Sequence, residues 1–248
     1  SLTYKIGDTV LKTIDLETGT TDSYKALATA GGNFPNALTG TLVIEATTSK
    51  DGTTYGVIAT TVVLTIPENG APVLNCGVGR VWDSSVPSSA KLSAFVQSQT
   101  GAMLNGQFIA QYGSSTAKLV FEIEGVKYEK DMAGLPQTSI SGPSAITGSG
   151  TIPWSATLTD SRGLSTTRTG SITVLPYSAP KIQSFSVSRA DENGKPIIDG
   201  TYAYISLQAS VSSLVVSNVE KNALSFHVEY KKADETDWTV CDTVTGSG

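Results

Sequence analysis

Apolar and polar residues alternate along much of the chain with a period of two, which indicates β-strands with one buried face. In residues 154–159 the apolar side chains fall on one face and the hydroxyls on the other. The turn Asp160-Ser161-Arg162-Gly163 follows, and residues 166–174 return as the next strand. Residues 41–48 and the strand through Ile66 repeat this layout around a Lys-Asp-Gly turn. Asp-Gly and Arg-Gly pairs fit hairpin tips that need positive φ.

The middle of the chain continues the pattern with two irregular stretches. Leu119, Phe121 and Ile123 alternate with Val and Glu, and Gly125 marks the return strand. Residues 86–96 predict one or two helical turns, and no convincing amphipathic helix is present. Residues 131–153 are rich in Gly, Ser and Pro. They predict either a long loop or a short edge strand between turns.

The last part of the chain has one strongly alternating strand and one shorter one. One face of residues 202–211 holds Ala203, Ile205, Leu207, Ala209 and Val211, and the other holds Tyr202, Tyr204, Ser206, Gln208 and Ser210. A later strand places Phe226, Val228 and Tyr230 on one face, and Trp238 is expected in the core. This order of strand, Lys-Lys-Ala-Asp turn and Trp is common in fibronectin-III-like sandwiches.

A repeat divides the chain. In residues 60–74 and again in 169–182, a β-rich run ends at a proline and a short spacer leads to an Ala-Pro pair. The pairs end at positions 72 and 180, 108 positions apart, about the length of one immunoglobulin-type sandwich. The repeat predicts an all-β chain of tandem immunoglobulin- or fibronectin-III-like antiparallel β-sandwiches. The expected modules span 1–70, 71–178 and 179–248. The first is expected to lack its beginning and the third its end.

Composition agrees with this fold class and excludes some functions. The chain is 39% hydrophobic and only 16% charged, which suits sheets with uncharged polar faces. The net charge of −5 and the absence of a basic stripe argue against a nucleic-acid partner. No apolar run reaches the roughly 18–20 residues of a membrane span. Cys76 and Cys241 fall in different modules and are expected to be free thiols, with Cys76 partly buried.

The chain lacks the usual sets of catalytic residues. His227 is the one histidine, and by alternation it faces solvent, so no Ser-His-Asp or Cys-His set can form. One histidine and two distant cysteines also exclude a structural zinc site. Glu122 and Glu124 are two residues apart on a predicted strand, a spacing compatible with an inverting glycosidase pair, although exposed hairpin glutamates are the simpler interpretation. We therefore expect no enzyme and no cofactor.

Calcium and sugar binding are the remaining site types. The Asp191-Glu192-Asn193-Gly194 cluster is rich in oxygen ligands but lacks EF-hand spacing and fits a turn. Sugar binding uses exposed aromatic side chains beside amides. Tyr202, Tyr204 and Gln208 share a predicted outer face and are our candidate ligand-binding residues. Other candidates are Trp82 and Tyr112, whereas Trp154, like Trp238, is expected in the core.

Five motifs between residues 153 and 205 carry a resemblance to a known family. They are Trp154-Ser155, Thr159 through Gly163, the linker Val174 through Pro180, Ser186 through Arg189, and Asp199 through Tyr202. This stretch resembles siphophage minor structural proteins from phages of Gram-positive bacteria, with the linker as the most specific part. The first seventy residues match only through the repeat, because Glu68-Asn69-Gly70 replaces the Tyr-Ser spacer. The resemblance implies a tail or baseplate component of the virion and no catalytic residues.

Three functions remain open from the sequence. The first is a virion structural protein, extracellular on the phage tail, that spaces or displays a host-recognition element. It would contact other tail or baseplate proteins and form a homo-oligomer, since virion assemblies are symmetric. The second is a carbohydrate-binding adhesion module that recognises host cell-wall polysaccharide. The third is an accessory region of a glycosidase or peptidoglycan hydrolase.

Overall fold

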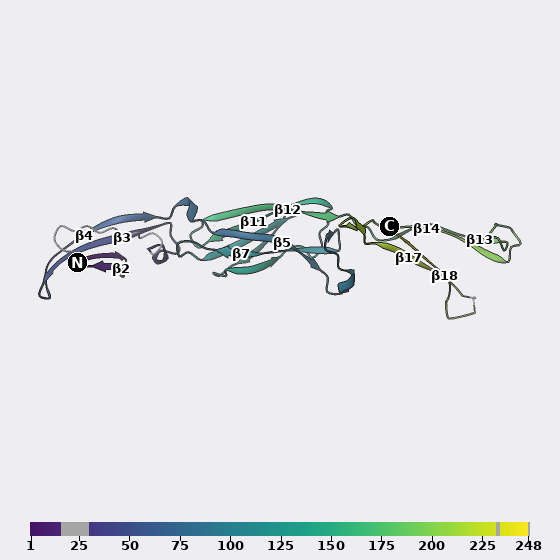
Figure 1. The fold of residues 1–248 in the computed structure, drawn as a ribbon, viewed down its shortest axis with the longest axis horizontal. Coiled ribbons are helices and arrows are strands. Elements are labelled where there is room, and N and C mark those ends of the chain that lie inside the picture. Colours follow the sequence, from purple (N-terminus) through teal and green to yellow (C-terminus); the bar gives the residue numbers. More distant parts are fainter. Residues whose placement is uncertain (16–29, 232–233, 248) are drawn as a thin grey trace. The chain divides into compact units, whose positions relative to one another are not determined.

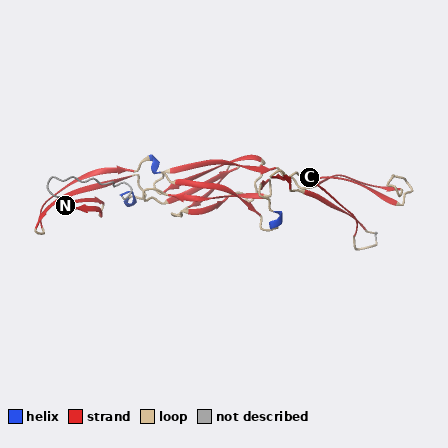
Figure 2. Cartoon of the chain, in the orientation of Figure 1, coloured by secondary structure: helices blue, strands red, loops and turns tan. Residues whose placement is uncertain are grey.

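The computed structural model describes residues 1–15, 30–231 and 234–247, and the side chains of 226 and 241–247 lie outside this description. Strands make up nearly all of its regular structure (Figures 1 and 2). In chain order they are β1 (Leu2–Ile6), β2 (Thr9–Ile14), β3 (Thr39–Lys50), β4 (Thr53–Thr65), β5 (Val73–Trp82), β6 (Phe95–Val96), β7 (Thr100–Ile109), β8 (Thr116–Ile123), β9 (Val126–Asp131), β10 (Gln137–Ser141), β11 (Gly150–Asp160), β12 (Ser165–Leu175), β13 (Lys181–Ala190), β14 (Tyr202–Ser210), β15 (Val215–Val216), β16 (Val219–Glu220), β17 (Ala223–Tyr230) and β18 (Thr239–Ser247). The predicted all-β class is confirmed.

The chain forms two compact units. The first contains Ser1–Gly79, Ala102–Pro143 and Pro153–Ile172, and the second contains Arg80–Gly101, Ser144–Ile152 and Thr173–Gly248. These units divide the chain differently from the three predicted modules, whose boundaries stay a prediction.

An antiparallel sheet of order β2-β1-β3-β4 occupies the N-terminal part of the first unit. β3 and β4 form the hairpin that the sequence predicts, paired from Thr39 opposite Thr65 to Lys50 opposite Thr53. Asp51 and Gly52 at its tip both have positive φ, 50° and 77°, as a two-residue hairpin turn requires.

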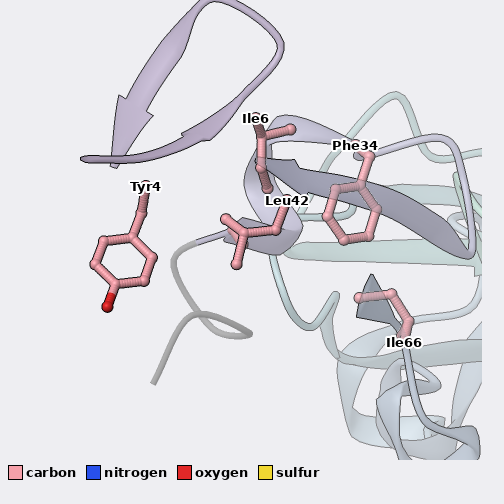
Figure 3. Packing of buried hydrophobic residues seen from close by; sticks show 6 residues of the cluster. Tyr4, Ile6, Phe34, Leu42 and Ile66 are labelled. Atoms are coloured by element: carbon pink, nitrogen blue, oxygen red, sulfur yellow. The ribbon is translucent and has the colours of Figure 1, made fainter. Parts of the chain in front are cut away.

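A small apolar core packs beside this sheet (Figure 3). Its buried members are Tyr4, Ile6, Ala30, Phe34, Leu42 and Ile66. Two half-buried side chains from distant parts of the sequence, Tyr112 and Leu164, pack against it. The cluster therefore joins the N-terminal sheet to segments that precede β8 and β12.

Two further sheets supply the larger core. One has the order β10-β7-β5, and in the other β12, β11, β8 and β9 follow one another. Leu119, Phe121 and Ile123 on β8 are almost completely buried, as their alternation predicts. On β7, Leu104 and Phe108 are buried to the same degree. The Gly-Ser-Pro-rich stretch contains β10 at a sheet edge, so the edge-strand alternative is the correct one.

The helical turn expected within 86–96 is a single 3-10 turn, Ser88–Ala90, in the second unit. In the same unit the two-residue strand β6 pairs with the end of β12 in parallel, with Phe95 opposite Val174. This pair departs from the antiparallel arrangement that the sequence predicts.

The remaining strands of the second unit pair two by two among the described residues: β13 with β14, β15 with β16, and β17 with β18. The register of the first pair places Phe185 opposite Leu207 and Val187 opposite Ile205, with Ser186 opposite Ser206 on the other face. One face is therefore apolar and the other polar, as the alternation predicts.

The expectation for Trp238 was wrong. It precedes β18 with 60% of its surface exposed, and the Lys231 Nζ lies 5.1 Å from its ring centroid. Its ring makes a cation–π contact with a lysine and does not pack in a core. Trp154 is buried as expected, and its ring lies over Gly170, where any Cβ would clash with it.

Candidate functional site

The predicted turn between β11 and β12 makes many hydrogen bonds to other segments of the first unit. The Asp160 Oδ1 accepts hydrogen bonds from the backbone N–H of Arg162 and of Leu164, at 3.0 and 2.9 Å. An aspartate that caps its own turn in this way fixes the chain direction. Gly163 completes the turn with a φ of 87°. The turn directs the Arg162 side chain away from its own hairpin.

Arg162 is only 8% exposed, which is rare for an arginine. Its guanidinium donates to five backbone carbonyl oxygens. The bonds run from Nε to Phe34 O (3.4 Å) and Ala37 O (3.1 Å), from Nη1 to Gln111 O (2.9 Å), and from Nη2 to Gly31 O (2.8 Å) and Tyr112 O (2.5 Å). The guanidinium also lies 6.0 Å from the Phe34 ring centroid, within cation–π range. One side chain thus joins three separate segments.

Ser161 adds a second set of bonds beside Arg162. Its Oγ donates to Pro35 O at 2.6 Å and accepts from the Ser115 N–H at 3.1 Å. Its own N–H donates to Ser115 O at 2.8 Å. Residues 161 and 162 therefore bond to the same two segments, 31–37 and 111–115, from neighbouring positions of one turn.

The charge of Arg162 is balanced without an ion pair. No carboxylate in the described part of the chain lies within ion-pair distance of its guanidinium. Carbonyl dipoles surround it, and the buried Asp160 carboxylate, two positions earlier, has one oxygen, Oδ2, with no hydrogen-bond partner in the described structure. A buried charge that is fully hydrogen-bonded avoids most of the desolvation cost.

Glycines allow the two segments to meet backbone to backbone. A Cβ on Gly31 would lie 2.5 Å from Tyr112 O, and a Cβ on Gly113 would lie 2.4 Å from Gly32 Cα. Neither position therefore accepts a side chain without movement of the backbone. The segments must be this close for Arg162 to reach carbonyls on both.

The proline-marked linker that precedes β5 is bonded to the same unit. Ala71 O accepts from the Gln111 Nε2 at 3.0 Å, and Pro72 O accepts from the Thr166 Oγ1 at 2.6 Å. Pro72 itself is buried. We call the contacts of residues 31–37, 71–72, 111–115 and 161–166 the first junction. The bonds of the first junction run between its own segments, so it joins distant parts of the chain.

The candidate ligand-binding residues lie together in the second unit. Tyr202, Tyr204 and Gln208 occupy alternate positions of β14, so they share one face, and all three are exposed. Their neighbours across the ribbon include Ser184 and Ser188. The predicted arrangement is present, although what it binds is untested.

The two other aromatic candidates lie elsewhere. Tyr112 packs against the small core and gives its carbonyl to Arg162. Trp82 is half-buried, and its indole Nε1 has no acceptor in the part of the chain described. Neither belongs to the face of β14 that carries Tyr202, Tyr204 and Gln208, which we call the tyrosine face.

The glutamate pair does not have its predicted geometry. β8 ends at Ile123, and Glu124 sits in the following turn with a φ of 52°, so the two residues do not share a strand face. The Glu122 carboxylate faces the Lys127 Nζ at 3.9 Å. Both residues border an open cavity of about 610 Å³ beside Trp154, which has no histidine in its lining.

The other titratable candidates have ordinary structural positions. His227 is exposed on β17, as predicted. Cys76 is a buried free thiol on β5, and burial raises the pKa of this thiol while nearby Arg168 acts in the opposite direction. The side chain of Cys241 lies outside the described residues. The Asp191 Oδ1 accepts from the N–H groups of Asn193 and Lys195, at 3.0 and 2.9 Å, which is a turn.

One apolar groove is lined by both β13–β14 and β17–β18. Its volume is about 570 Å³, and its lining includes Ile182, Phe185, Ile205, Leu207 and Tyr230. Of these, Ile205, Leu207 and Tyr230 are on the apolar strand faces that the alternation predicts, and such faces were expected to be buried. They line an open groove instead, because the strands of this region pair only two by two among the described residues.

Sequence reasoning found the turn at 160–163 but missed the role of Arg162. An arginine at a hairpin tip is ordinarily a solvent-exposed residue. Three of its five acceptors are backbone carbonyls more than a hundred positions earlier, and the other two are 51 and 50 positions earlier. A backbone carbonyl can belong to any residue type, so the sequence gives no sign of these bonds. The one signal in the sequence for a special role of this turn is that it is among the motifs that carry the family resemblance.

Comparison with known proteins identifies the family. The model of a family described as "Siphovirus protein of unknown function" (DUF859) matches residues 1–248. The chain belongs to this family. The expected siphoviral origin is thereby confirmed, and the family description assigns no role. No curated protein matches the chain.

One solved structure has a weak similarity to the chain. It comes from work titled "Ca2+-stabilized adhesin helps an Antarctic bacterium reach out and bind ice". The identity is 14% and the TM-score 0.27, and the match covers all of this chain and 63% of that one. No helix among the described residues is long and apolar enough to cross a membrane.

Proposed function

We propose that this chain is a structural protein of the phage tail tip or baseplate, in which its β-sheet modules space or display a host-recognition element. The observation that carries the proposal is the first junction. A spacer must transmit position from one module to the next, and a buried guanidinium bonded to both sides does this without a flexible linker. Membership of a siphovirus family supports the same assignment.

The finer fold assignment belongs to this proposal. In residues 71–178 two sheets bury alternate residues of β7 and β8. We take this to be an immunoglobulin-like sandwich, in which the inner faces of two sheets interdigitate. The β13–β18 region would be a fibronectin-III-like module whose apolar faces border the groove. Sandwiches in series are suited to reach and display.

No catalytic role is part of the proposal. Glu122 lies on β8, whereas Glu124 lies in the turn that follows it. The polar groups of the first junction bond to one another. If a hydrolase activity were found in this chain, the double substitution Glu122→Gln and Glu124→Gln should leave its rate unchanged. A complete loss of the rate would assign the pair a catalytic role and contradict the proposal.

The test of location is electron microscopy of virions labelled with an antibody to this chain. We expect label at the tail tip or baseplate, where the protein would contact other tail proteins and further copies of itself. Label that appears only on the host envelope, and never on virions, would refute the structural role.

A second candidate function is recognition of host cell-wall polysaccharide. The tyrosine face favours it, because Tyr202 and Tyr204 are 56% and 45% exposed on a face whose other members are hydroxyls and an amide. Exposed rings that stack on sugars next to amide donors are a common binding arrangement. Binding of the purified chain to host cell walls should fall when both tyrosines are changed to alanine. Equal retention of the variant would remove this candidate.

A further inference from the structure

The outer edge of the N-terminal sheet differs from the edges that β9 and β10 form. β4 ends the order β2-β1-β3-β4 of the described strands, and its thirteen residues, TTYGVIATTVVLT, contain no charge and no proline. By contrast, β9 ends its sheet with four charged residues out of six, and β10 is only five residues long. Charges and short length are the usual protection of an edge against pairing with another chain. β4 has neither.

Both faces of β4 are also exposed and apolar. Ile58 and Val63 are 74% and 66% exposed, and Val57 and Val62 are large exposed residues as well. Ile58 and Val62 alternate with Val57 and Val63, so each face of the strand carries two of the four. A long edge strand with apolar side chains on both faces is a template for one more strand.

We propose that two copies of the chain associate through β4, which pairs antiparallel with β4 of the second copy. This names the surface for the homo-oligomer and rests on the proposed assembly role for its expectation of several copies. A second copy is favoured because the strand is complementary to itself: it has no charge to repel an identical strand and apolar residues to cover on both faces.

The register of the pairing follows from symmetry and from one bulge. The pairing of β3 with β4 shifts between Thr48 and Ser49 and leaves Tyr55 without an opposite residue. A bulge of this kind twists the strand, so the regular part of β4 is residues 56–65. A two-fold axis perpendicular to the sheet keeps each side chain on its own face, so opposite residues must both be odd-numbered or both even-numbered.

An axis at Thr60 pairs residues 56–64 of the two copies and places their large apolar side chains opposite one another. Ile58 then lies opposite Val62 of the second copy on one face, and Val57 lies opposite Val63 of the second copy on the other. β-Branched residues that face each other in this way stabilise antiparallel pairs. These nine residues of each copy would supply about eight to ten backbone hydrogen bonds, close to the number found in a typical protein interface.

Sedimentation velocity of the purified chain across the micromolar range tests the pairing. We expect a concentration-dependent dimer. Ile58→Lys alone and Val62→Glu alone should each weaken it by about tenfold or more. The double variant with both substitutions should restore the dimer, because the introduced lysine of each copy then faces the introduced glutamate of the other. Neighbouring registers do not place these two positions opposite each other, so the rescue is specific to the Thr60 axis.

The matched control is Val126→Lys, which adds a lysine to the charged edge strand β9 and should leave the dimer unchanged. A chain that stays monomeric at all concentrations overturns the proposal, as does a dimer that Ile58→Lys does not weaken or that the double variant does not restore. The virion-labelling result is independent of these outcomes. Label on virions together with a monomer in solution would refute this pairing alone, and a dimer without label would refute the structural role alone.

Discussion

The two proline-marked junctions of this chain look alike in sequence and are held in different ways. The first has a buried proline, a buried arginine bonded to five carbonyls, and a serine bonded to both neighbouring segments. At the second, within the other unit, Pro176 and Pro180 are exposed. There the Tyr177 N–H bonds to the Gln97 Oε1 at 3.2 Å, and the Ser178 N–H bonds to the Ser212 Oγ at 2.7 Å.

The difference shows that a repeated linker sequence does not determine the mechanics of a junction. Exposed hydrogen bonds between neutral groups exchange readily with water and contribute little net stability. Bonds from a buried guanidinium to carbonyls are stronger, and their loss leaves the carbonyl oxygens of Ala37 and Tyr112 without another described donor. We therefore expect the first junction to be rigid and the second to be the more easily opened.

Removal of the guanidinium should have the largest effect. Arg162→Ala removes all the guanidinium bonds and leaves the carbonyl oxygens of Ala37 and Tyr112 without another described donor, so we expect it to lower the free energy of unfolding by about 3–4 kcal/mol. Arg162→Lys keeps the charge but loses the planar fork, so it should recover only part of the loss. Denaturant unfolding measures both. The control is Arg168→Ala on the following strand, β12, where the guanidinium makes an exposed bond to one side chain. Equal effects at 162 and 168 would contradict the special role of Arg162.

Ser161 and Ser212 offer matched substitutions at the two junctions. Ser161→Ala removes a partly buried set of bonds and should cost about 1–2 kcal/mol. Ser212→Ala removes exposed bonds and should cost about 0.5 kcal/mol. Denaturant unfolding of the two variants gives the ranking. A larger cost at Ser212 would reverse the comparison.

The hairpins on both sides of the first junction were predictable because their signals are local. Strand alternation and the Asp-Ser-Arg-Gly turn lie close together in the sequence. The burial of Arg162 depends on glycines at 31 and 113, which allow distant backbone segments to come into contact. No local sequence pattern predicts such a contact. Trp238 was misplaced for a related reason: a core assignment assumed facing sheets, whereas the described strands around it pair two by two.

A fall in pH should destabilise the second junction before the first. Hydrogen bonds from the Ser213 hydroxyl and then from the backbone N–H groups of Asn222 and Leu214 lower the pKa of Glu220 to about 2. A depressed carboxyl pKa contributes stability that is present above the unfolded value, near 4.5, and is lost as the pH falls towards 2.

Asn222 connects this carboxylate to the second junction, because its Nδ2 donates to Ser212 O at 2.7 Å. The bonds that join the segments of the first junction come from a guanidinium, which stays protonated throughout this range. The protection factors of the Leu214 and Asn222 amides, which correct for the intrinsic pH dependence of exchange, should therefore fall below pH 4.5, before that of the Ser161 amide, which donates to a backbone carbonyl. An earlier loss of protection at Ser161, or unchanged protection at Leu214, would contradict this order.

The width of a distance distribution across each junction tests the central claim most directly. In a chain with both cysteines replaced by serine, spin labels at Thr48 and Lys127 report on the first junction, and labels at Lys91 and Ser206 report on the second. Double electron–electron resonance should give a narrow distribution for the first pair and a broader one for the second. Arg162→Ala should broaden only the first. Equal widths in the unsubstituted chain, or a first pair that Arg162→Ala leaves narrow, would contradict the account.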